Sequence, residues 1–309
     1  MVRYIGLLCL VYVKQNIMET KAPKKFPFQK ELISLIQKEL TLHSVYVISV
    51  YPEKRKQDVY LTPINKNTKR QVTYTLLIIG HKSPRKNLGD LMAYLYNKTQ
   101  QRCKVYAIFH TLANIMYRID VGDNFLTRAI SQTPCMYKED DALLRFSQYQ
   151  ICFHRLVYKT IKEGWMNRMK RADYLLTVIN TIEDNEEPNS KLAVAHCAVE
   201  QMCLALLNLF WEYKPHHYSL DYLLHLCSHF TQLPNRIFPR TTFGLQRQYY
   251  MLCNAQDILR FKDNNEFSKN DAHKVAKLCE RFYDEAVTLG KEQLKHLKEL
   301  HCRQDVKSQ

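Results

Sequence analysis

The most regular run of apolar residues lies between positions 192 and 210, where apolar side chains recur every three or four residues. This spacing predicts a helix over 191–211 with a wide apolar stripe, typical of a helix that packs in a protein core. Glu200 lies within the stripe, and Pro215 follows the helix. The stripe consists of Leu192, Ala195, Val199, Met202, Cys203, Leu206 and Phe210.

The chain on both sides of this helix also has helical periodicity. Asn189 or Ser190 is a suitable N-cap for the core helix. In the second half of the chain, the first predicted helix contains Gly164, where we expect a break. The last predicted helix begins with the capping-box spacing of Ser268 and Asp271. The other predicted helices cover 142–182, 219–230, 243–260 and the segment from 268 onward, with a proline-bearing loop over 233–240.

The first half of the chain alternates between strand and helix patterns. Runs rich in β-branched and aromatic residues predict strands, and Asn87 is a suitable cap for a helix between two of them. The predicted strands cover 45–51, 71–81 and 104–110, and a further amphipathic helix covers 28–40. This order describes a small α/β domain with a mixed sheet.

A length of 309 residues is most simply divided into two domains. The charged segment Lys138–Asp141 marks the point where strand signals end. We therefore expect an α+β two-domain protein, in which an α/β domain over 26–140 precedes an all-α antiparallel bundle over 141–303. An extension (1–25) and a tail (304–309) flank these domains.

The segment 1–16 contains an apolar run, which raises the question of a signal sequence. We expect none, because no small-residue cleavage site follows and the run is shorter than the roughly 20 residues that span a bilayer. Either Met1 or Met18 is then the true start. The expected location is the cytoplasm, without a membrane partner.

Net charge narrows the class of partner that the protein can bind, and cysteine spacing indicates the state of the thiols. Lys and Arg exceed Asp and Glu by 45 to 30, a net charge of +15 that favours a polyanion such as nucleic acid or a nucleotide, or an acidic protein. The ten cysteines include no C-x-x-C pair. Most of them lie on apolar helical faces, which predicts reduced, buried thiols rather than a disulfide framework or a zinc site.

Three phrases in the helical half resemble the HEPN family (higher eukaryotes and prokaryotes nucleotide-binding). They are Ala195–Leu207 around Glu200, His217–Leu224, and Asp257–Asp263, which resembles the family's R-Y-P-D phrase. The resemblance implies an antiparallel helical bundle that commonly pairs as a homodimer. Many members are ribonucleases that use an R-x(4–6)-H pair, with Arg stabilising phosphate charge and His acting as general base. No Arg of the helical half precedes a His by that interval.

The first half resembles the nucleotidyltransferase fold that often precedes HEPN domains. The resemblance rests on a G-x-x-F-L-x-x-I phrase and a short following strand that ends in Tyr, which here are Gly122, Phe125, Leu126, Ile130 and Tyr137. Active members have a Gly-Ser turn after the first strand and a D-x-D pair on the second, which bind triphosphate and divalent metal.

This sequence lacks both features. The first strand runs into Ser49 and Val50 without a Gly-Ser turn, and Thr73 and Thr75 stand where the aspartates would be. Hydroxyl groups are poor substitutes for carboxylates as Mg²⁺ ligands. Glu53 and Asp58 are the nearby acids, and a solvated turn is the simpler interpretation of the segment that contains them. We therefore expect a domain without this activity.

Two groups of residues are candidates for ligand binding. The first precedes a helix N-terminus, where unpaired N–H groups favour an anion, although a solvated loop would have the same composition. The second consists of His196 and Glu200, which we expect to make structural hydrogen bonds in the bundle or to contact a phosphate, together with Arg260. The first group comprises His81, Lys82, Ser83, Arg85 and Lys86.

Histidines also suggest a metal site. His225 and His229 are four residues apart, and His216, His217 and Cys227 are close in sequence. Zinc needs three or four converging ligands, and Cys227 lies on the opposite side of the helix from the His pair. We therefore expect no metal site and no cofactor.

The function expected from these features is that of a non-catalytic nucleotide- or RNA-binding regulator of HEPN type, of the kind derived from a toxin–antitoxin module. Two enzymatic alternatives remain open. One is a HEPN ribonuclease that uses residues outside the motif, for which Arg260 is the candidate. The other is a nucleotidyltransferase acting on a small molecule or a protein. Expected partners are a nucleotide or RNA, a second copy of the chain, or another protein.

Overall fold

The computed structural model describes residues 26–52, 71–181, 187–264 and 267–302. These residues form two compact units, which divide between Cys152 and Phe153. The first unit contains a sheet with helices and the second is helical, so the predicted α+β class is confirmed. The expectations about Met18, Glu53 and Asp58 lie outside the described residues.

The first unit is built on a four-stranded mixed sheet with the order β3-β2-β1-β4. β1 is antiparallel to both β2 and β4, whereas β2 and β3 are parallel and are connected through helix α2 (Leu88–Lys98). The strands are β1 (Leu42–Pro52), β2 (Val72–Gly80), β3 (Cys103–Thr111) and β4 (Cys135–Lys138). The mixed sheet agrees with the strand pattern of the sequence.

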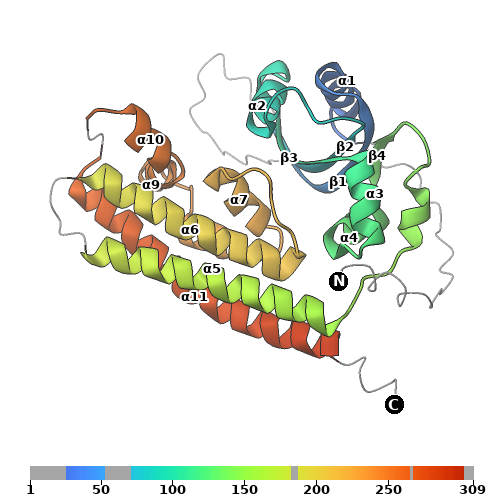
Figure 1. Ribbon diagram of the computed structural model, residues 1–309. Helices are drawn as coiled ribbons and strands as arrows, with labels where there is room; N and C mark the ends of the chain where they lie inside the picture. Colours follow the sequence, from blue (N-terminus) through green and yellow to red (C-terminus); the bar gives the residue numbers. More distant parts are fainter. Residues whose placement is uncertain (1–25, 53–70, 182–186, 265–266, 303–309) are drawn as a thin grey trace. The chain divides into compact units, whose positions relative to one another are not determined.

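Helices cover both faces of this sheet (Figure 1). One face packs against α1 (Gln29–Glu39) and α2, and Tyr74, Leu76 and Ile78 of β2 point into that core. Since strand side chains alternate, the residues between them face the opposite layer. That layer holds α3 (Leu112–Asp120) and α4 (Asn124–Gln132).

The second unit is a bundle of three long helices with shorter ones packed beside them (Figure 1). Helix α6 is its centre and contacts α5, α7, α9, α10 and α11. Its side chains are buried nearly all round from Leu192 to Leu209, as expected of a uniformly apolar helix. The helices are α5 (Arg155–Thr181), α6 (Pro188–Trp211), α7 (Leu220–Cys227), α8 (Leu233–Ile237), α9 (Phe243–Cys253), α10 (Ala255–Phe261) and α11 (Lys269–Cys302).

The two ends of this bundle meet. The backbone N–H of His154, just before α5, donates to Nδ1 of His301 near the end of α11, at 3.1 Å. The ring of His301 also makes an edge contact with Phe153. These contacts fix the start of α5 against the end of α11.

The helix predicted over 142–182 is wrong in its first part. Leu144–Gln148 form a 3₁₀ helix (η1) within the first unit, and α5 begins only at Arg155. The Asn124 side chain donates to the Cys152 carbonyl and accepts from the Cys152 N–H, which holds this stretch extended against α4. The predicted break at Gly164 is also wrong, since α5 runs through it.

Other boundaries differ in smaller ways. Glu187 is the N-cap residue of α6 and Pro188 lies in the first turn, so Asn189 and Ser190 are inside the helix rather than capping it. The helix predicted over 243–260 is divided at Asn254 into α9 and α10, and part of the predicted loop forms α8.

The capping box at Ser268 is confirmed. The Asp271 N–H donates to the Ser268 hydroxyl at 3.1 Å, and the Ser268 N–H donates to the Asp271 carboxylate at 3.3 Å. Asn87 likewise caps α2 by accepting from the Asp90 N–H at 2.8 Å.

Among the described residues, α6 is long and apolar enough to span a membrane by length and composition. In the most apolar 18-residue stretch of α6, 78% is buried inside the protein. The core helix of a soluble protein has the same pattern. The nine cysteines in the described part of the chain are free thiols. The prediction that they are buried holds for Cys103, Cys203, Cys227 and Cys279 and is wrong for the other five, which are half-buried or exposed.

Candidate anion-binding pocket in the helical unit

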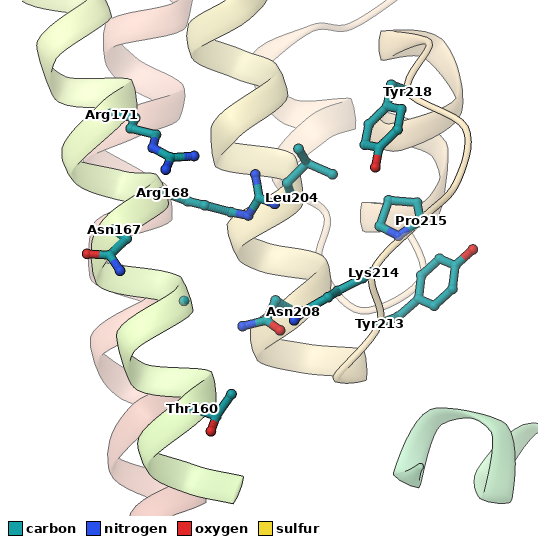
Figure 2. A pocket seen from close by; sticks show the side chains of 11 residues that line it. Thr160, Asn167, Arg168, Arg171, Leu204, Asn208, Tyr213, Lys214, Pro215 and Tyr218 are labelled. Carbon is teal, nitrogen blue, oxygen red and sulfur yellow. The ribbon is translucent and has the colours of Figure 1, made fainter. Parts of the chain in front are cut away.

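A basic pocket lies between α5, α6 and the link that follows α6 (Figure 2). Helix α5 contributes residues at spacings of three and four, which places them on one helical face. Arg168 and Arg171 extend from this face toward α6, and Thr160 lies at the end of the pocket nearer the start of α5. The α5 residues are Thr160, Gly164, Asn167, Arg168 and Arg171.

The floor of the pocket depends on a close approach of α5 and α6. Asn208 of α6 is buried and donates through Nδ2 to the Ile161 carbonyl of α5 at 3.3 Å. A Cβ at Gly164 would lie only 2.9 Å from the same nitrogen. Glycine at this position therefore leaves room for the amide of Asn208, which lines the pocket together with Leu204.

The link after α6 closes a third side. Glu212 adopts a left-handed conformation with φ 57°, which turns the chain out of the helix, and the Tyr213 N–H then donates to the Leu207 carbonyl at 3.2 Å. Tyr213 is buried, so the link is anchored. Lys214 is exposed, and its side chain extends over the pocket near Asn208 (Figure 2). Tyr218 lines the outer edge of the pocket.

Arg168 is the most enclosed cation of the pocket. Its Nη1 donates to Oε1 of Gln201 at 3.0 Å, which orients the guanidinium between the helices. Burial lowers the pKa of Arg168 and the neighbouring Arg171 lowers it further, whereas Tyr218 and Glu200 raise it. Arginine nevertheless stays protonated in proteins, so the pocket keeps this charge.

Glu200 lies beside this cation. Burial raises the pKa of the Glu200 carboxyl, and the charge of Arg168 opposes that change. The described residues that line the cavity include three cations, Arg168, Arg171 and Lys214, and no carboxylate.

The chemistry of this arrangement favours an anion. The cavity measures about 220 Å³, and guanidinium and ammonium donors converge on it beside the amides of Asn167 and Asn208. Guanidinium groups match the geometry of phosphate and carboxylate oxygens, and hydrogen bonds between ionised groups are the stronger kind. The pocket can therefore hold a phosphate group through several charged donors.

The first group of predicted residues does not line this pocket. His81 binds Glu139 at 2.5 Å, and Lys86 pairs with Glu39 at 3.0 Å while lying over the Tyr94 ring. The remaining members, Lys82, Ser83 and Arg85, are exposed. At the adjacent helix N-terminus, Asn87 accepts the Asp90 N–H and the Asp90 carboxylate supplies negative charge, so part of the attraction for an anion is already satisfied within the chain.

The three residues of the second predicted group, His196, Glu200 and Arg260, each contact a different part of the helical unit. His196 is buried, and its Nδ1 hydrogen-bonds the Leu252 carbonyl at 2.9 Å, which connects α6 to α9. Glu200 interacts with Arg168, next to the pocket. Arg260 is exposed on α10 and lies over the ring of Phe261. Of the predicted candidates in the helical unit, Glu200 is the one that interacts with a cation of the basic pocket.

Metal-ligand geometry is not found in the described part of the chain, where no group of three His, Cys, Asp or Glu side chains is placed to hold an ion. His217 bonds the Ser219 hydroxyl at 2.8 Å, and Nδ1 of His229 bonds the His225 carbonyl at 3.0 Å. His225 and His229 are half-buried. Thr73 and Thr75 are buried within β2.

The three pocket cations were not predicted from the sequence. The available signal was the R-M-K-R run at 168–171, because its two arginines are three residues apart and follow Gly164 on the same helical face. Lys214 had no local signal, since its position depends on the turn after α6.

No protein-family model matches the chain, and no curated protein sequence matches it significantly.

Proposed function

We propose that this protein is a non-catalytic, nucleotide- or RNA-binding regulator of HEPN type, and that the basic pocket of the helical unit binds phosphate. The observation that carries the proposal is the convergence of Arg168, Arg171 and Lys214 on one cavity whose described lining contains no carboxylate. Glu200 interacts with Arg168 from outside the lining, so Arg171 and Lys214 are the cations most available to an external anion. The net charge of +15 would also attract polyanions over a longer range.

The pocket's chemistry supports binding more than cleavage. Among the described residues that line it, the polar groups are cations, amides and hydroxyls, without a histidine or carboxylate to act as general base. Arg260, the candidate for a ribonuclease outside the motif, is on α10 and does not line the pocket.

The nucleotidyltransferase-like character of the first unit is part of the same proposal. Its support is the order of strands and helices around a mixed sheet, together with the Gly122–Ile130 phrase. Hydroxyls at Thr73 and Thr75 in the first half of β2 favour a role without metal-dependent transfer.

A binding screen on the intact chain tests the proposal. Mononucleotides and short RNAs are titrated by fluorescence anisotropy, with and without Mg²⁺, against wild type and the double variant Arg171→Ala/Lys214→Ala. Lys170→Ala is the matched control, because Lys170 is an exposed cation of α5 that does not line the pocket. We expect the double variant to weaken binding at least tenfold and the control to change it less than twofold.

Salt dependence gives a second readout for RNA. Removing one cation that binds an RNA phosphate reduces the slope of log K against log salt concentration by about 1. Equal affinity of the double variant and wild type for every ligand would contradict the proposed function of the pocket. Binding that requires Mg²⁺ would favour the nucleotidyltransferase alternative.

A further inference from the structure

We infer that the pocket selects a terminal phosphomonoester, as in a nucleoside monophosphate or a phosphorylated RNA end, over an internal phosphodiester. This inference rests on the proposed function, because it names the ligand class of the same site. Three features carry it: the number of cations, the size and walls of the cavity, and the placement of Arg168.

The charge of the pocket matches a dianion better than a monoanion. Arg168, Arg171 and Lys214 supply three positive charges, and Glu200, which lies outside the lining, is an acid that interacts with Arg168. Counting Glu200 as ionised leaves a surplus of two positive charges. A phosphomonoester carries about −1.5 to −2 near neutral pH, whereas a phosphodiester carries one negative charge.

The cavity suits one phosphate group rather than a whole nucleotide. Its volume of about 220 Å³ is below the roughly 300 Å³ at which pockets for drug-sized ligands begin. A cavity of this volume holds a phosphate with part of its sugar, and the base then lies outside, where Tyr218 is exposed at the edge. An aromatic ring at that place can stack on a base of any identity.

The walls restrict how the ligand leaves the cavity. Helices α5 and α6 form two sides and the anchored link from Tyr213 to Tyr218 forms a third (Figure 2). A terminal phosphate is joined to the rest of its molecule through one ester bond and needs one exit. An internal phosphodiester is joined through two and would have to leave the cavity in two directions.

Arg168 can distinguish the two groups chemically. One of its N–H donors is engaged by Gln201, which holds the planar guanidinium in place and leaves further donors for the cavity. A phosphomonoester offers three terminal oxygens to these donors and to Arg171 and Lys214, whereas a phosphodiester offers two. The absence of one acceptor oxygen leaves an enclosed donor without a charged partner.

The test compares ligands that differ only in the phosphate. The intact protein is titrated with AMP, adenosine and the dinucleoside monophosphate ApA, and with one RNA hexamer carrying a 5′-phosphate, a 3′-phosphate or only hydroxyl ends. We expect AMP to bind at least tenfold more tightly than ApA, adenosine to bind most weakly, and one phosphorylated end of the hexamer to be preferred tenfold over hydroxyl ends.

Variants connect the preference to the pocket. Arg168→Gln and Lys214→Gln are each expected to reduce the monoester preference at least fivefold, and the control Lys170→Gln is expected to retain it. Lys214 is exposed, so Lys214→Gln remains informative if the half-buried Arg168→Gln variant is unstable by circular dichroism.

The outcomes separate this inference from the proposed function. If ApA and hydroxyl-ended RNA bind as tightly as the phosphorylated ligands, and the pocket variants weaken all of them, the selectivity is wrong and the proposed function stands. If the variants leave the binding of every ligand unchanged, the pocket is not the binding site and both are overturned. AMP binding without a preference among RNA ends would identify a free nucleotide as the ligand.

Discussion

The indole of Trp165 on α5 occupies the space that a side chain at Gly290 of α11 would fill. A Cβ at position 290 would overlap the six-membered ring of Trp165, which is 5% exposed and held in the core of the bundle. The two longest helices of the unit therefore approach closely at this point because one of them carries no side chain there.

Gly290→Ala is expected to destabilise the protein despite the higher helix propensity of alanine. Inserting a methyl group into a packed core costs about 1–3 kcal/mol, which exceeds the propensity gain of roughly 1 kcal/mol. Urea denaturation followed by circular dichroism measures the change. Gly244→Ala on α9 is the control, since a Cβ there meets no atom within 4 Å, and it should leave stability unchanged or raise it.

Ser268→Ala should lower the free energy of unfolding by about 1 kcal/mol, because it removes the hydroxyl that accepts the Asp271 N–H at the start of α11. Ser190→Ala is a matched comparison. The Ser190 hydroxyl lies inside the first turn of α6 and bonds Glu187 at 3.4 Å, so its removal should cost less than half as much. Equal costs would show that Ser190 caps α6 after all.

The buried imidazole of His196 predicts a pH dependence of stability. Burial lowers the pKa of His196 below its ordinary 6.5, and the hydrogen bond to Leu252 and the charge of Asp257 oppose this effect. The unfolded chain therefore takes up a proton at a higher pH than the folded chain does. The contribution of His196 to stability is complete above a pH of about 6.5 and is lost as the pH falls toward the lowered value.

His196→Asn retains a donor for the Leu252 carbonyl and removes the titrating ring. Unfolding free energies are measured from pH 8 to pH 5 for wild type, His196→Asn and the exposed control His273→Asn. Below pH 6.5, the unfolding free energy of wild type should fall more steeply with decreasing pH than that of His196→Asn. The curves of wild type and His273→Asn should be parallel. Parallel curves for all three would contradict the prediction.

Glu200→Gln should strengthen phosphate binding. Removing one charge near a bound anion is worth about 1 kcal/mol at a separation of roughly 4 Å in water, which corresponds to about fivefold in affinity. AMP titration at pH 7.5 measures the change, with Glu163→Gln as the control on the exposed side of α5. Weaker binding in Glu200→Gln would indicate that the carboxylate orients Arg168 more than it opposes the ligand.

The parts of the fold that local spacing determines were predicted from the sequence. The strands around Tyr74 and the core helix around Glu200 follow from apolar periodicity, and the caps at Asn87 and Ser268 follow from side chains that reach only their own first turn. The start of α5 was not predicted, because Asn124, 28 residues earlier, holds the Cys152 backbone out of the helix.

Less of the candidate pocket than of the fold could be predicted from the sequence. Arg168 and Arg171 belong to a basic run that would look the same on a solvated helix face, and only the packing of α5 against α6 and the following link gives them a cavity. Lys214 joins them because Glu212 adopts a left-handed conformation after α6. Such positions depend on tertiary contacts, which periodicity does not encode.

The hydrogen bond between His154 and His301 places the entrance and the exit of the helical unit side by side. A domain whose ends adjoin can be inserted into a loop of a host protein, or circularly permuted with a short connector, without stretching its core. The bundle from Phe153 to Cys302 therefore has the geometry of a domain that can be inserted into another protein. A permuted gene that joins its two ends and opens at the link between α7 and α8 should encode a chain with the same helix content.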